Sequence, residues 1–159
     1  METRACQQTQ ILPASWRDFR PVMALEKACF PQDSWPWFDI LAALTFPETV
    51  RLKAVLEGQV VGFVIGDRRQ RQEVGWIASI GVHPDLRRNG IGRKLLQACE
   101  CELATPRIRL TLRPSNVGAL RLYQTSGYVE IDRLERYYHN GEGAIVMEKV
   151  LASSEARRS

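Results

Sequence analysis

The chain has 159 residues, of which 45% are hydrophobic, and its 22 Lys and Arg residues against 18 Asp and Glu residues give a formal net charge of +4. This length and apolar content suit one compact domain with its own hydrophobic core, and exclude a small scaffold that depends on disulfides. The surplus of positive charge fits anionic partners. It is too small to choose among nucleotides, acidic peptides and nucleic acid.

The cysteines and the N-terminal residues bear on the cellular compartment in which the protein works. The cysteines show no C-x-x-C spacing, so we expect neither a zinc site nor any other metal. The opening residues METRACQQTQ lack the apolar core of a signal peptide, and no apolar run approaches the roughly 20 residues of a membrane span. We therefore expect a soluble protein of the reducing cytoplasm with no membrane partner.

The first half of the chain predicts a strand, two helices and a hairpin. Residues 9–14 predict a short strand, and 15–30 carry apolar residues at helical spacing after Ser15, a plausible N-cap. Two prolines and two tryptophans in 31–37 predict a loop before a second helix. Two β-rich runs in 49–68 then flank Glu57-Gly58-Gln59, which is typical of a tight hairpin turn.

The second half predicts alternating strands and helices. A buried strand over 73–82 precedes a helix over about 91–104, and a strand over 107–113 precedes a helix that begins after Ser115-Asn116 and ends at Gly127. Two closing strands follow, over 128–138 and 143–150. We expect one domain over 1–150 and a disordered tail over 151–159.

The stretch HPDLRRNGIGRKLL, residues 83–96, predicts a phosphate site. Gly90 and Gly92 allow close approach of the backbone, and the following helix directs the positive end of its dipole to the same point. A P-loop is excluded because Leu95 follows Lys94 where a Ser or Thr is required. The dinucleotide fingerprint fails because Leu95 also replaces its third glycine.

What remains is R-x-x-G-x-G between a strand and a helix, and here the chain resembles the GNAT superfamily of acetyltransferases. LTLRPSNVGALRLYQTSGY, residues 110–128, resembles the second signature of that superfamily. The likeness extends over roughly Gln10 to Val150 and is greatest to the ribosomal-protein alanine N-acetyltransferase (Rim-type) group, through CFP...W, VHPDLRRNGIG, RPSNVGALRLY and RYYHNGEGAIVM. It implies an α/β (α+β) fold with a mixed, mostly antiparallel sheet of about six to seven strands, splayed at its centre, and about four flanking helices.

The same resemblance implies acetyl-CoA as cofactor and assigns residues to it. The backbone of the splayed central strand would hold the pantetheine arm and the acetyl oxygen, and the loop and helix start would hold the pyrophosphate. The matching residues are Ile80, Gly81, Val82, Arg87, Arg88, Asn89, Gly90, Ile91, Gly92, Arg93, Asn116 and Tyr123. Ser115-Asn116 is also an ordinary N-cap, and both roles can hold together.

For the chemistry, Tyr123 matches the general acid of the superfamily, a phenol that protonates the leaving thiol. The alternative is a tyrosine packed on the inner face of its helix. Thr111 departs from the Rim-type pattern, which has a glutamate there as the proposed base, and a threonine hydroxyl cannot take a proton at neutral pH. A water could relay the proton to Glu73, His83 or a loop tyrosine, although Glu73 also fits a surface charge and His83 a structural role.

The acceptor implied by the Rim-type likeness is a protein or peptide N-terminus. Tyr137 and Tyr138, between the last two strands, would hold the peptide backbone, and Phe30 and Trp35 would form the opposite wall with Trp37; all could instead be caps of the core. A small-molecule amine acetyltransferase and a non-catalytic acetyl-CoA sensor remain as alternatives. Nucleic-acid binding is not favoured, because no aromatic residues interleave with a basic face.

Overall fold

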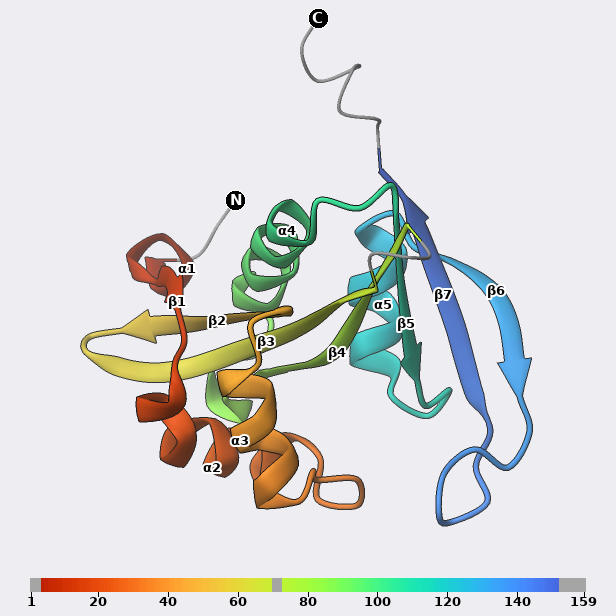
Figure 1. The fold of residues 1–159 in the computed structure, drawn as a ribbon, viewed down its shortest axis with the longest axis horizontal. Helices are drawn as coiled ribbons and strands as arrows, with labels where there is room; N and C mark the ends of the chain where they lie inside the picture. Colours follow the sequence, from red (N-terminus) through yellow and green to blue (C-terminus); the bar gives the residue numbers. More distant parts are fainter. Residues whose placement is uncertain (1–3, 70–72, 152–159) are drawn as a thin grey trace, which may run out of the picture. The chain divides into compact units, whose positions relative to one another are not determined.

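The computed structural model describes residues 4–69 and 73–151. Its helices are α1 to α5 and its strands β1 to β7 (Figure 1). Two short 3-10 helices, η1 and η3, are also present. In chain order the elements are α1 (Arg4–Gln8), β1 (Gln10–Pro13), η1 (Trp16–Asp18), α2 (Phe19–Cys29), α3 (Trp37–Thr45), β2 (Thr49–Leu56), β3 (Gln59–Arg69), β4 (Val74–Val82), η3 (Pro84–Leu86), α4 (Ile91–Leu103), β5 (Arg107–Leu112), α5 (Val117–Thr125), β6 (Val129–Leu134) and β7 (Ala144–Val150).

The strands form one seven-stranded sheet in the order β1-β2-β3-β4-β5-β7-β6. The pairs β1–β2, β2–β3, β5–β7 and β6–β7 are antiparallel, whereas β4 and β5 run parallel. This confirms the predicted mixed, mostly antiparallel sheet. The expected hairpin is present too, since Leu56 pairs with Gln59 and both turn residues, Glu57 and Gly58, have positive φ.

Two details differ from the expectation. A short helix, α1, precedes β1, so the described residues hold five α-helices rather than about four. Strand β3 continues through Arg69, one residue beyond the β-rich stretch expected to end at residue 68. The predicted tail from residue 152 onward lies outside the described residues.

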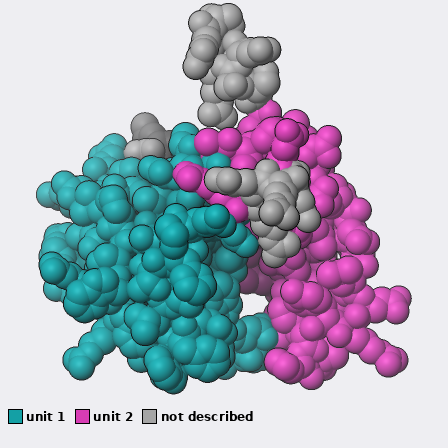
Figure 2. All heavy atoms as spheres, viewed as in Figure 1, with its two compact units in different colours: residues 1–67, 78–103 teal, residues 68–77, 104–159 magenta. Residues whose placement is uncertain are grey.

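The chain divides into two compact units, coloured teal and magenta in Figure 2. Unit 1 comprises Met1–Asp67 and Ala78–Leu103, and unit 2 comprises Arg68–Ile77 and Ala104–Ser159. Strand β4 changes unit after Ile77. Each unit is described by itself below.

In unit 1, alternate residues of strand β3 face two different layers of helices. Phe63 and Ile65 pack into the apolar cluster formed with α2 and α3. Gly62 and Gly66 face α4 instead, where a Cβ at Gly66 would come 2.8 Å from Cys99 Sγ. Because side chains alternate across a strand, α4 covers one face of the sheet and α2 and α3 cover the other (Figure 1).

In unit 2, the core lies along β5 and β7. Their pairing joins six residue pairs, from Arg107 with Val150 to Leu112 with Ile145. The buried side chains of this core include Ile108, Leu110, Leu112, Tyr123, Tyr128, Ile145 and Met147. Tyr123 reaches it from helix α5, so the helix and the strands position that tyrosine together.

Candidate active site

Strand β4, the expected cofactor strand, pairs with β5 over its first residues only. Pairing of β4 with β5 covers Val74–Trp76 and Arg107–Arg109 and ends before Ile80–Val82. The last residues of β4 belong to unit 1, where the N–H of His83 donates to Val61 O at 2.8 Å and continues the register with β3.

Helix α2 packs on this end of β4. A Cβ on Gly81 would lie 2.9 Å from Phe63 Cε1 and 3.0 Å from Cys29 Sγ, so only glycine fits without displacing a neighbour. The Cys29 thiol also donates to Val82 O, at 3.4 Å. These contacts fix the backbone of Gly81–Val82 against α2.

The loop before α4 turns sharply at two positions in the left-handed region, Arg88 with φ 65° and Gly90 with φ 83°. The Asn89 amide nitrogen donates to Leu86 O at 2.9 Å and to Arg87 O at 3.2 Å, so this side chain braces the loop. The first N–H groups of a helix have no acceptor within the helix and carry its positive dipole end. With the exposed side chains of Arg87, Arg88 and Arg93 beside it, the start of α4 fits a pyrophosphate group.

Lys94, in the same motif, binds backbone carbonyl groups. Its ammonium donates to Thr9 O at 2.6 Å and to Cys6 O at 3.3 Å. It therefore ties α4 to the residues at the C-terminal end of α1. The sequence offered no signal for this contact, because α1 itself was not predicted.

Tyr123 is the buried phenol of unit 2, with 6% of its surface exposed. Its ring meets the edge of Tyr128, with centroids 5.8 Å apart. Burial first, and the neighbouring Tyr138 phenol second, raise the pKa of Tyr123 well above its ordinary value. The hydroxyl therefore keeps its proton at every physiological pH and can act as a donor.

The residues before α5 are arranged as the sequence suggested. Asn116 is the N-cap, since its Oδ1 accepts from the N–H of Ala119 at 3.2 Å. Thr111 lies on β5 opposite Val146 and is half-buried. The structure thus has a hydroxyl where the Rim-type pattern carries a carboxylate.

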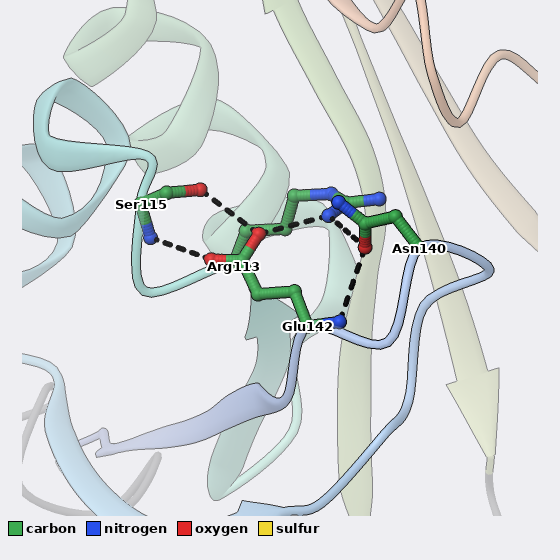
Figure 3. A network of polar contacts seen from close by, with 4 residues as sticks. All are labelled: Arg113, Ser115, Asn140 and Glu142. Carbon is green, nitrogen blue, oxygen red and sulfur yellow. Dashed lines mark hydrogen bonds and ion pairs between the residues drawn. The ribbon is translucent and has the colours of Figure 1, made fainter.

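The sequence did not assign any role to Arg113 or Glu142, which join the start of α5 to the β6–β7 loop (Figure 3). Arg113 Nη1 donates to Glu142 Oε1 at 2.8 Å and to Asn140 Oδ1 at 2.9 Å. The Ser115 hydroxyl donates to Glu142 Oε1 and the Ser115 N–H to Glu142 Oε2, at 2.9 and 3.1 Å. We call Arg113, Ser115, Asn140 and Glu142 the loop clasp.

The loop clasp determines where the paired tyrosines lie. Tyr137 and Tyr138 fall in the loop between β6 and β7, with their rings edge to face at 5.0 Å. The strand expected over 128–138 is shorter, because β6 ends at Leu134. Tyr138 is half-buried under the Arg113 guanidinium, whose carbon is 4.0 Å from the ring centroid. Tyr137 is 55% exposed and is free to meet a ligand.

The aromatic residues after α2 lie partly against the core of unit 1 and partly along a groove. Phe30 and Trp35 both pack partly against the α2–α3 core cluster. Trp35 also lines a groove of about 540 Å³. The other residues along it are Phe19, Met23, Lys27, Ser34, Pro36 and Trp37.

Two of the candidate proton relays, Glu73 and His83, flank strand β4 in the sequence, one directly before it and one directly after it. Glu73 is exposed and directly precedes β4, at the strand end opposite to Ile80–Val82, where it lines a 460 Å³ pocket with Arg107 and Arg109. His83 caps η3, and its Nδ1 accepts from the N–H of Asp85 at 3.2 Å. This contact gives His83 a structural task.

Comparison with known protein families matches residues 10–128 to the acetyltransferase (GNAT) family. The chain belongs to this family. It is 28% identical over 160 residues to an N-alpha-acetyltransferase of Sulfurisphaera tokodaii, covering 92% of this chain and 95% of that protein. Among solved structures, Ard1 from Thermoplasma volcanium superposes with a TM-score of 0.83 at 25% identity, covering 92% of this chain and 99% of that one. The ribosomal-protein-S18-alanine N-acetyltransferase of Escherichia coli does so with a TM-score of 0.81 at 23% identity, covering 92% and 97%.

The family assigns both the reaction and its donor. A matching structure of the NatC complex was solved with Gag peptide and CoA bound, at a TM-score of 0.81 and 21% identity over 91% of this chain and 99% of that one. The protein is an acetyl-CoA-dependent N-acetyltransferase, as the sequence predicted, and the Rim-type enzymes are among its structural neighbours.

Within residues 4–69 and 73–151, no helix is long and apolar enough to cross a membrane. No three His, Cys, Asp or Glu side chains in that part of the chain are grouped to hold a metal ion.

Proposed function

We propose that this protein transfers the acetyl group of acetyl-CoA to the N-terminal α-amine of a protein or peptide. The observation that carries the proposal is the exposed Tyr137 beside the clasped Tyr138, in the loop next to the protonated Tyr123. The likeness to an N-alpha-acetyltransferase over 92% of the chain supports the same acceptor. Ribosomal proteins are one class of candidate target, by the likeness to the S18-alanine enzyme.

In this proposal the chain holds acetyl-CoA through one set of residues. The backbone of Ile80, Gly81 and Val82 receives the pantetheine arm and the acetyl oxygen. The pyrophosphate is bound by the start of α4 and the loop before it, that is, by Arg87, Arg88, Asn89, Gly90, Ile91, Gly92 and Arg93. Asn116 contributes from the cap of α5.

Tyr123 is the general acid. The thioester supplies an activated acetyl group, and the amine displaces the thiol from it. Tyr123 donates its phenolic proton to the departing sulfur, and its raised pKa keeps that proton on the phenol until then. The proton that the attacking amine gives up passes to solvent water, and the phenolate regains a proton from solvent. On the acceptor side, Tyr137 and Tyr138 of unit 2 bind the peptide backbone. Phe30 and Trp35 of unit 1 are assigned to acceptor binding as well.

The α-amine also explains how the enzyme works with Thr111 in place of a carboxylate. An α-amine with a pKa near 7.7 to 8.0 is roughly one-tenth neutral at pH 7, whereas a lysine near 10.4 is neutral in about one molecule in 2,500. The neutral α-amine attacks without a base on β5. The absence of a carboxylate at Thr111 therefore selects against lysine.

An intramolecular competition tests this proposal. A peptide with a free α-amine and one internal lysine is incubated with protein and acetyl-CoA, and fragmentation mass spectrometry locates the acetyl group. We expect modification of the α-amine in large excess over the lysine. Equal labelling of both amines, or preference for lysine, would refute the α-amine assignment.

A further inference from the structure

Glu26 is a carboxylate sealed inside unit 1, with 2% of its surface exposed on helix α2. Both of its oxygens accept hydrogen bonds. Oε2 accepts from the Ser79 hydroxyl at 3.0 Å, and Oε1 accepts from the backbone N–H of Trp35 at 3.3 Å. No ion pair joins Glu26 to any other residue that the structure describes, so these two bonds account for its burial.

The two residues that donate to Glu26, Ser79 and Trp35, belong to segments to which we assign different roles. Ser79 precedes Ile80 on β4, and with Gly81 it shares the strand face that α2 covers. Trp35 lies in the α2–α3 loop and lines the 540 Å³ groove. One buried carboxyl on α2 therefore connects the strand assigned to acetyl-CoA with the loop assigned to the acceptor.

Among the described residues, the α2–α3 loop makes few backbone–backbone hydrogen bonds. Among the described backbone bonds, Asp33 N–H donates to Phe30 O at 3.2 Å, and residues 31–35 make no further backbone bond outside regular helix and strand. The Glu26–Trp35 bond is the polar contact that anchors its C-terminal end. Its loss would leave Trp35 held by packing alone.

We propose that Glu26 is a positioning residue that fixes the α2–α3 loop to β4 and so sets the affinity for the acceptor peptide. This inference rests on the proposed function, in which Trp35 contributes to acceptor binding. The positioning role requires hydrogen bonds and not a negative charge. The polar contacts that the structure describes for the Glu26 side chain are the hydrogen bonds from Ser79 and Trp35.

The hydrogen-bond account separates two substitutions of similar size. In Glu26→Gln the amide oxygen still accepts from Trp35, and the amide nitrogen donates to the Ser79 hydroxyl oxygen. In Glu26→Leu both bonds are lost. The Gln variant should therefore keep both hydrogen bonds, and the Leu variant should lose them.

Asp18 offers a matched control in the same unit. It is 9% exposed, accepts from the backbone N–H of Ser15 at 2.9 Å and from Lys53 Nζ at 2.8 Å, and has no bond to Trp35 or to β4. Asp18→Leu thus removes a carboxylate of the same kind from the other end of α2. It reports what general loss of stability does to activity.

The experiment measures KM and kcat for a peptide α-amine and for acetyl-CoA, together with hydrogen exchange at the Trp35 amide. We expect Glu26→Leu to raise the peptide KM about tenfold and to speed Trp35 exchange, with the acetyl-CoA KM within about twofold of the parent value. Glu26→Gln and Asp18→Leu should leave the peptide KM and Trp35 exchange near the values of the parent protein. Ser79→Ala, which removes one bond only, should give a smaller rise and covers the case in which Glu26→Leu does not fold.

Three results would overturn the inference. An unchanged peptide KM in both Glu26→Leu and Ser79→Ala would remove the positioning role. Equal loss of kcat in Glu26→Gln and Glu26→Leu would assign Glu26 to proton transfer instead. Unchanged Trp35 exchange in Glu26→Leu would show that packing alone holds the loop. Failure of the proposed function looks different, because the parent protein itself would then leave peptide α-amines unmodified.

Discussion

Arg113 lies over the ring of Tyr138, with its guanidinium carbon 4.0 Å from the ring centroid, while the same guanidinium donates to Glu142 at 2.8 Å. One cation thus joins a carboxylate and an aromatic ring across 29 residues of sequence. Cation–π and charged hydrogen-bond contacts of this kind are worth more in a partly buried place, and the Arg113 side chain is 13% exposed. The loop clasp therefore holds the tyrosine pair in one arrangement.

Glu142→Gln should weaken peptide binding. The neutral amide keeps one acceptor and loses the charge that orients Arg113, so Tyr138 is held less firmly. We expect the peptide KM to rise by about tenfold, the effect of losing a hydrogen bond between charged groups. Steady-state kinetics with a peptide α-amine measure it. Glu130→Gln is the control, because Glu130 pairs with Arg133 on the exposed face of β6, and a similar rise there would contradict a specific role of the clasp.

The same substitution should change how stability depends on pH. The hydrogen bonds from Arg113, then Ser115, lower the pKa of Glu142 in the folded protein. A carboxyl whose pKa is lower in the folded state stabilises fully above its unfolded pKa of about 4.3, and that contribution is lost as the pH falls through the folded value. Urea unfolding should therefore show a difference between parent and Glu142→Gln that is constant from about pH 7 to 5 and shrinks below about pH 4. A difference that grows in acid would contradict the sign of the shift.

Tyr123→Phe should abolish most turnover and leave cofactor binding intact. Removal of the proton donor typically costs about 10²- to 10⁴-fold in kcat, whereas the ring itself still packs against Tyr128. Calorimetry with acetyl-CoA and steady-state kinetics separate the two effects. Tyr128→Phe, a second buried phenol of unit 2, should keep most of its activity. Full activity in Tyr123→Phe would remove its role as acid, and a parent protein that binds acetyl-CoA without turnover would favour a sensor.

The pH profile should follow the substrate. With a threonine at position 111, kcat/KM for a peptide α-amine should rise with pH up to the amine pKa of about 7.7 to 8.0 and then level off. The raised pKa of Tyr123 predicts no decline before about pH 10, because the phenol stays protonated. A profile that is flat between pH 6 and 8 would reveal an enzyme base. A fall between pH 8.5 and 10 would contradict the protonated Tyr123.

Gly66→Ala should destabilise unit 1. The new methyl group would lie 2.8 Å from Cys99 Sγ and 3.1 Å from Leu103 Cδ2, so α4 would have to move off the sheet. We expect a loss of about 1–3 kcal/mol in the free energy of unfolding by overpacking. Cys99→Ala in the same chain should recover part of it. Gly118→Ala, with open space around its Cβ, should be neutral or stabilising by about 0.5–1 kcal/mol, and an equal loss there would contradict the packing argument.

Local patterns predicted most of the elements correctly, because each pattern and its cause lie within a few residues. Helix α5 begins at its Asn116 cap, and the β2–β3 turn follows from Glu57-Gly58, where the glycine allows positive φ. Helix α4 ends at Leu103, one residue before the predicted end. Helix α1 was missed because five residues show too little periodicity to predict a helix.

The contacts that position the candidate site could not be predicted in the same way. Glu26 and Ser79 are 53 residues apart, and Arg113 and Glu142 are 29 apart. Each partner alone has the spacing of an ordinary helix or loop residue, and only folding brings the two together. The sequence motifs thus predict which chemistry the chain performs, and long-range pairs hold the loops that we assign to the acceptor.

The most direct test of N-terminal acetylation uses two peptide pools and intact-mass analysis after incubation with acetyl-CoA. One pool has free N-termini and no lysine, and the other has blocked N-termini and internal lysines. We predict a mass increase of one acetyl group in the first pool alone. Acetylation of the second pool, or of neither, would contradict the central claim and direct attention to lysines or to small amines.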